Sequence, residues 1–204
     1  MYKPINLQIK HLCIERGERL LCQKLSFTVE GGELIRIAGE NGSGKSSLMK
    51  ALLGWLPIEE GTIEFNGEDI SVHRDSLLAE QLYIGHATGI KDIFTVQENL
   101  SLYCPNSHES DRLEALRNLN LADFEDTPAG DLSAGQKRRV ALTRLWLTDK
   151  QIWFLDEPFT ALDAQGTLTL EHRIKEHLAS GGAVIMTTHQ PLQTLLPKII
   201  ELKT

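Results

Sequence analysis

The sequence predicts an α/β fold built around a largely parallel β-sheet. Short apolar segments rich in β-forming residues alternate along the chain with segments of helical spacing. A glycine-rich loop, residues 39–46, lies between one such strand and one such helix, as in a strand-loop-helix unit. No internal repeat, low-complexity segment or long linker interrupts this pattern. Residues 1–204 are therefore interpreted as a single domain.

The first third of the chain is predicted to be rich in strands. Alternating or apolar patterns indicate strands over residues 7–10, 25–29, 33–38 and 62–65. Glycine-containing turns are expected at residues 31–32 and 66–67. The spacing of apolar residues over 46–53 predicts a helix directly after the glycine-rich loop.

The remainder of the chain divides into a helical middle and a second strand-helix-strand unit. Few strand signals occur over about 87–147, where helical spacing covers residues 96–102 and 109–119. Later, residues 151–155 and 183–187 have the composition of buried parallel strands, and a crossover helix is predicted between them over 167–178.

Composition excludes several classes of protein. No run of about 18 apolar residues and no secretory signal is present, so the chain is expected to be cytoplasmic and to reach any membrane through a partner. The net charge of −7 argues against nucleic acid as a partner. The basic run Lys137 to Arg139 is explained equally well by a solvated helix face. Cys13, Cys22 and Cys104 show no metal-ligand spacing and are interpreted as reduced, packed thiols.

The glycine-rich loop matches the phosphate-binding pattern G-x-x-x-x-G-K-[ST]. Its residues are Gly39, Glu40, Asn41, Gly42, Ser43, Gly44, Lys45 and Ser46, with Ser47 following. Glycines let the backbone amides turn toward a phosphate, and the N-terminus of the following helix favours anions. Lys45 is expected to reach the β- and γ-phosphates, and the Ser46 hydroxyl is expected to bind Mg²⁺.

An apolar strand ends in two carboxylates, Asp156 and Glu157. Ligands of parallel sheets bind at this end of the strands. Asp156 is suited to hold Mg²⁺ through water, and Glu157 is suited to act as general base on an attacking water molecule. Taken alone, the same pattern also describes an ordinary strand followed by an acidic turn, and the upstream phosphate-binding loop favours the catalytic interpretation.

The segment Leu132-Ser133-Ala134-Gly135-Gln136, about 20 residues before Asp156, resembles the LSGGQ signature of ABC ATPases. The resemblance implies a P-loop NTPase of the ABC ATPase type, with a mixed or parallel core sheet, an N-terminal antiparallel β subdomain and an inserted α-helical subdomain over about 87–147. It implies ATP and Mg²⁺ as cofactors and a homodimer. In such a dimer Ser133, Gly135 and Gln136 contact ATP bound to the opposite subunit.

Other motifs follow in the order that this family shows. Asp163 resembles the aspartate of the loop that crosses the dimer interface, and His189 resembles the histidine that contacts the γ-phosphate. Two positions differ from the family pattern. Arg16 replaces the aromatic residue that stacks on adenine, and it either stacks through its guanidinium or is a surface arginine. His86 replaces the glutamine near Mg²⁺, and it can hydrogen-bond a water or ligate a metal.

Several stretches resemble the ATP-binding subunits of the cytochrome c biogenesis (heme export) system. They are residues 84–86, 89–91, 133–136, 144–147, 156–161 and 187–191. The resemblance implies integral membrane permease subunits similar to CcmB and CcmC, a peripheral location on the cytoplasmic face of the bacterial inner membrane, and only indirect contact with heme. An ATPase of another transporter and a soluble non-transport ABC ATPase stay open as alternatives.

Overall fold

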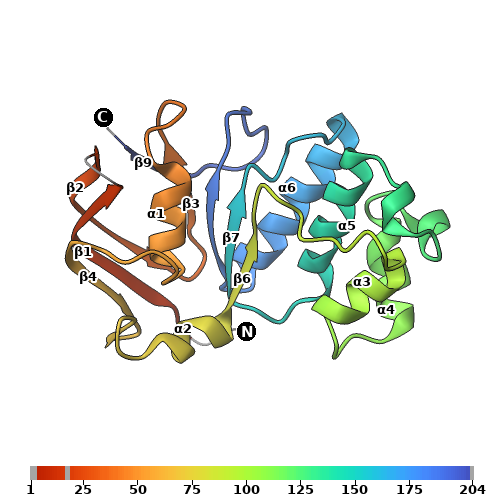
Figure 1. Ribbon diagram of the computed structural model, residues 1–204, viewed down its shortest axis with the longest axis horizontal. Coiled ribbons are helices and arrows are strands. Elements are labelled where there is room, and N and C mark those ends of the chain that lie inside the picture. Colours follow the sequence, from red (N-terminus) through yellow and green to blue (C-terminus); the bar gives the residue numbers. More distant parts are fainter. Residues whose placement is uncertain (1–3, 17–18, 203–204) are drawn as a thin grey trace.

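The computed structural model describes residues 4–16 and 19–202. Two sheets and the helices between and beside them form successive layers (Figure 1). An antiparallel sheet has the strand order β2-β1-β4-β5. Its strands are β1 (Asn6–Arg16), β2 (Arg19–Glu30), β4 (Glu60–Phe65) and β5 (Glu68–Asp69).

The second sheet is parallel throughout and has the order β6-β7-β8-β3-β9. Its strands are β3 (Leu34–Ala38), β6 (Gln81–Ile84), β7 (Ile152–Asp156), β8 (Ala183–Thr187) and β9 (Lys198–Glu201). The helices are α1 (Lys45–Leu52), α2 (Arg74–Glu80), α3 (Val96–Tyr103), α4 (Glu109–Arg117), α5 (Ala134–Leu147) and α6 (Ala164–Ala179). Short 3₁₀ helices cover Ala122–Phe124 and Ala129–Asp131.

The predicted fold class is confirmed. Every strand and helix predicted from the sequence is present, most with ends shifted by one or a few residues. In Figure 1, α1 lies between the two sheets, and α3, α4 and α5 gather beyond the far side of the parallel sheet. The strands β5, β6 and β9 and the helix α2 were not predicted, because segments of two to seven residues give too short a pattern. The helix α5 was given no predicted limits, although it lies in the region of about 87–147 that was predicted to be helical.

The central strands of the parallel sheet are buried on both faces. All five residues of β7 and of β8 are buried. Alternation sends Phe154 and Ile185 toward the core that contains α1, while Trp153 and Met186 face the core that contains α5 and α6. This double burial explains why these strands are continuous apolar runs and fixes where their carboxyl ends lie.

No helix within residues 4–16 and 19–202 is long and apolar enough to cross a membrane. Cys13 and Cys22 are buried, Cys104 is partly buried, and all three are free thiols. Burial is the main reason that the pKa of Cys22 and that of Cys104 are raised above their ordinary value. These observations agree with packed thiols of low reactivity.

A buried histidine lies under the amino end of the parallel sheet. The ring of His177 stacks on Trp153 with 3.6 Å between ring centroids, and its Nε2 is 3.0 Å from the carbonyl oxygen of Gln151. Burial, aided by the nearby Arg173 cation, lowers the pKa of His177 from 6.5 to about 4. The folded state therefore holds a neutral imidazole at neutral pH.

This lowered pKa predicts a loss of stability in acid. Because the unfolded chain binds the proton more readily, the free energy of unfolding should fall as pH drops below 6.5, and the fall should end near pH 4. The shift corresponds to roughly 3 kcal/mol. Urea denaturation at several pH values checks this, with His177→Phe as the control. An equally steep fall in the variant would contradict the assignment to His177.

Candidate functional site

Four neighbouring strands of the parallel sheet, β6, β7, β8 and β3, deliver residues of the predicted site at their carboxyl ends. His86 follows β6, Glu157 follows β7, His189 follows β8, and the glycine-rich loop follows β3. Parallel strands place such ends along one edge of the sheet, and ligands bind at that edge. The strand order thus brings together four segments that are far apart in the sequence.

These segments line a cleft of about 560 Å³. The residues around it are Leu21, Asn41, Gly42, Gly44, Lys45, Ser46, Ser47, His86, Asp156, Glu157 and His189. All but Leu21 were predicted from the sequence as site residues. Leu21, from β2, adds an apolar wall that the motifs did not indicate.

The glycine-rich loop turns through left-handed backbone conformations. Gly42 has a φ of 81° and Gly44 a φ of 100°, and a Cβ on Gly44 would lie 2.9 Å from the Cβ of Leu21. The helix α1 then begins at Lys45, and no described side chain caps its N-terminus. Uncapped amides at the start of a helix attract anions, so the geometry fits a phosphate group.

Two side chains complete the loop. The Lys45 Nζ donates to the carbonyl oxygens of Gly39 and Glu40 at 2.9 Å each. The Ser43 Oγ is buried without a hydrogen-bond partner in the described chain, and a Cβ on Gly39 would lie only 2.5 Å from it. Ser43 therefore packs behind the loop rather than lining the cleft, and this contact requires glycine at position 39.

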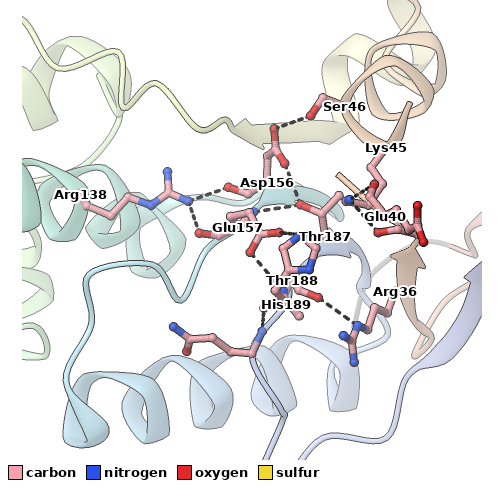
Figure 2. A network of polar contacts seen from close by, with 12 residues as sticks. Arg36, Glu40, Lys45, Ser46, Arg138, Asp156, Glu157, Thr187, Thr188 and His189 are labelled. Atoms are coloured by element: carbon pink, nitrogen blue, oxygen red, sulfur yellow. Dashed lines mark hydrogen bonds and ion pairs between the residues drawn. The ribbon is translucent and has the colours of Figure 1, made fainter. Parts of the chain in front are cut away.

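Asp156 lies between the loop and the next strand of the sheet (Figure 2). Its Oδ1 accepts a hydrogen bond from the Thr187 hydroxyl at 2.6 Å, and its Oδ2 accepts one from the Ser46 hydroxyl at 3.3 Å. Asp156 is 7% exposed. The structure thus brings together the two oxygen donors that the sequence assigned to Mg²⁺, and hard cations prefer such donors.

Glu157 is held in a left-handed backbone conformation with a φ of 51°. Its N–H donates to the carbonyl oxygen of Thr187 at 3.1 Å and to the Thr187 hydroxyl at 3.0 Å. Its carboxylate accepts from the backbone N–H of His189 at 3.2 Å, and its Oε1 lies 3.6 Å from Nε2 of the same histidine. Non-glycine residues rarely adopt this conformation, which persists where the surroundings impose it.

Arg138 corrects one interpretation of the sequence. The run Lys137 to Arg139 was attributed to a solvated helix face, but Arg138 is 5% exposed. Its guanidinium donates to the carbonyl oxygens of Asp156 and Glu157 (Figure 2) and to that of Gly85. The burial lowers its pKa, while the charge of Asp156 acts in the opposite direction. The basic run carried no signal that would have separated this arginine from its neighbours.

The signature residues lie outside the cleft. Ser133 and Gln136 form a capping box at the start of α5, with the Ser133 Oγ accepting from the Gln136 N–H at 3.2 Å. A Cβ on Gly135 would lie 3.6 Å from the carbonyl oxygen of Ala161. Asp163 caps α6 by accepting from the Gly166 N–H at 2.7 Å. Within one chain these four residues do not meet the glycine-rich loop.

The two residues that differ from the family pattern are His86 and Arg16. His86 lines the cleft with Asp156 and Glu157, and its role in place of the glutamine stays a prediction. The side chain of Arg16 lies outside the described residues. Thr187, which contacts both acidic residues, was not predicted; its place at the end of an apolar strand was its only signal.

Comparisons with known proteins agree with the motifs. The profile of the family described as "ABC transporter" matches residues 22–160. The chain is 49% identical over 187 residues to the cytochrome c biogenesis ATP-binding export protein CcmA of Salmonella typhi, covering 91% of this chain and 90% of the relative. It is 46% identical over 193 residues to the protein of the same name from Escherichia coli K12, covering 95% and 93%.

Solved structures share the fold. An Atm1-family bacterial ABC exporter with ATP bound superposes with a TM-score of 0.85 at 24% identity, covering 100% of this chain and 38% of that one. A putative ABC transporter ATP-binding protein from Pyrococcus furiosus gives a TM-score of 0.83 at 23% identity and covers 97% of both chains. Together, the family profile and the curated relatives show that the chain belongs to the ABC transporter family and is one of its ATPases, similar to CcmA.

Proposed function

We propose that this chain is the ATPase subunit of the export system for cytochrome c biogenesis, and that it works as a homodimer on the cytoplasmic face of a bacterial inner membrane. The observation that carries the proposal is the identity of 46–49% with CcmA proteins over more than nine tenths of the chain. Identity at this level extends over 91–95% of the chain, beyond the nucleotide motifs that all ABC ATPases share. Residues 1–204 then form a single nucleotide-binding domain.

The cleft supports the binding and hydrolysis of ATP with Mg²⁺. The loop from Gly39 to Ser47 surrounds the phosphates, and Lys45 supplies positive charge to them. Ser46 and Asp156 would hold Mg²⁺, with His86 near them, and the ion would supply charge neutralisation to the phosphates. Glu157 takes a proton from the attacking water, which is the role of a general base. His189 contacts the γ-phosphate.

The separation of the cleft from the signature supports a dimer. Ser133, Gly135 and Gln136 lie at the exposed start of a helix, where amides attract anions, but away from the chain's own cleft. Two chains that face each other place this helix start of one over the cleft of the other. Closure then depends on the nucleotide, because the phosphate contacts exist only while ATP is present. Asp163 lies at the interface between the subunits, and Arg16 either stacks on adenine or is a surface arginine.

The segment from His86 to Leu102 is the proposed contact with the membrane subunits. It begins at the cleft, and two of its apolar side chains are exposed, Ile93 by 84% and Leu102 by 52%. Exposed apolar side chains in a segment that begins at the cleft make this segment the candidate surface for a partner. The partners are integral permease subunits similar to CcmB and CcmC. Heme is contacted only through them, and nucleic acid is not a partner.

Purification of a trapped complex tests this function. A tagged Glu157→Gln chain is expressed in its native host, membranes are solubilised with ATP present, and copurifying proteins are identified by mass spectrometry. Cytochrome c biogenesis membrane subunits are expected, because a chain that binds ATP without hydrolysing it stays in the closed assembly. A Lys45→Ala chain, which should bind nucleotide poorly, is the matched control.

The other outcomes distinguish the alternatives. Recovery of a different permease would retain the transport ATPase and reject cytochrome c biogenesis. Recovery of ribosomes, or of no membrane protein, would favour a soluble ABC ATPase and reject the transport role.

A further inference from the structure

We propose that Arg138 is a positioning residue for ATP hydrolysis, which holds the backbone of Glu157 so that its carboxylate faces the attacking water. This inference rests on the proposed role of Glu157 as general base. It begins from the contacts of the guanidinium, whose two terminal nitrogens donate to three carbonyl oxygens. The acceptors are Asp156 at 2.8 Å, Glu157 at 2.9 Å and Gly85.

The backbone of Glu157 is strained. A φ of 51° is unfavourable for this residue and persists only where its surroundings impose it. Thr187 holds the peptide N–H of Glu157 on one side. On the other side the Glu157 carbonyl oxygen accepts from Arg138 at 2.9 Å and, at the longer distance of 3.3 Å, from the Thr160 N–H. The backbone is thus held on both sides of the Cα atom that carries the carboxylate, and loss of Arg138 leaves the carbonyl side with only the longer bond from Thr160.

Arg138 also connects two parts of the site. Gly85 directly follows β6 and precedes His86, which lines the cleft. The carbonyl oxygen of Gly85 accepts from Arg138. Arg138 lies in α5, whose first turn carries the capping residue Ser133 of the signature. A pocket of about 200 Å³ beside it is lined by His86, Thr88, Ala134, Arg138, Thr160 and Ala161. The buried side chain of Arg138 therefore joins the helix α5 to the carboxyl ends of the two strands β6 and β7.

The choice of arginine follows from donor geometry. A guanidinium offers five N–H donors in a rigid planar fork, so it reaches three carbonyl oxygens at once. Glutamine offers two donors on a single nitrogen, and lysine offers a charge without the fork. Neither substitute keeps all three carbonyl oxygens in place, although lysine retains the charge.

Steady-state ATPase kinetics of Arg138→Gln and Arg138→Lys test the proposal. Both variants should lower kcat by about 10- to 100-fold, because a small misplacement of a catalytic group has effects of this size. The KM for ATP and the Kd for MgATP should change little, since no contact to the phosphates is removed. Arg144→Gln is the matched control. It removes an arginine charge from the same helix. The guanidinium carbon of Arg144 lies 4.5 Å from the ring centroid of Tyr103, a contact that does not involve Glu157.

A double variant separates positioning from a general loss of structure. If Arg138 acts through Glu157, Arg138→Gln should lower the turnover of a Glu157→Gln chain no further, because residues that act as a unit are not additive. A multiplicative loss would overturn the proposal. So would full turnover in Arg138→Lys, or a loss of turnover in Arg144→Gln equal to that in Arg138→Gln. If Arg138→Gln does not fold, as judged by circular dichroism, Arg138→Lys carries the same test.

The proposed function and this inference fail in different ways. Full turnover in Glu157→Gln would reject the general base and, with it, the positioning of that base. Loss of turnover in Glu157→Gln together with normal turnover in Arg138→Gln and Arg138→Lys would retain the base and reject only the role of Arg138.

Discussion

Replacing Glu157 by glutamine is expected to lower ATP turnover by about 10²- to 10⁴-fold while leaving nucleotide affinity nearly unchanged. General base catalysis contributes about this factor, and an amide cannot accept the proton. Glutamine has the size of glutamate, and its amide oxygen can still accept the hydrogen bond that the backbone N–H of His189 donates to the side chain. The cleft should therefore keep its shape and bind MgATP.

Two measurements check this expectation. Phosphate release measures turnover, and size-exclusion chromatography with MgATP should show a stable dimer, because the closed state is not released by hydrolysis. Glu176→Gln, which removes an exposed carboxylate on α6, should leave turnover unchanged. Wild-type turnover in Glu157→Gln would reject its assignment as general base.

The second large effect is expected at Lys45. Its ammonium group lies at the loop, 2.9 Å from two backbone carbonyl oxygens. Lys45 is also the first residue of a helix whose N-terminus no described side chain caps. Lys45→Ala removes the positive charge that faces the phosphates. Hydrogen bonds to charged groups contribute about 1.5–3 kcal/mol each, so the loss of one or two should raise the Kd for MgATP by about 10²-fold or more.

Isothermal titration calorimetry with MgATP measures this change directly. Lys50→Ala is the control, because Lys50 lies on the exposed side of the same helix. This variant should bind nucleotide with the wild-type Kd. Circular dichroism establishes that both variants are folded. An unchanged Kd in Lys45→Ala would contradict the assignment of this lysine to the phosphates.

Some features of the site are local in the chain, and these could be predicted from the residues alone. The loop from Gly39 to Ser46 depends on glycines that tolerate left-handed conformations and on the helix that follows. Consecutive residues therefore determine its geometry. The same holds for the strand that ends at Asp156, whose five buried residues form one apolar run. Both were predicted with nearly correct limits.

Other features depend on the order of strands in the sheet, which no local pattern states. The hydrogen bonds from Ser46 and Thr187 to Asp156 form only because β7 lies beside β8 and β8 lies beside β3. Arg138 gave the appearance of an exposed basic residue, and only the approach of α5 to two strand ends buried it. Chemistry that resides in backbone dihedral angles and in residue type can be read along the chain. Contacts between distant segments arise when the core closes around the sheet, because burial of apolar surface selects which strand ends meet.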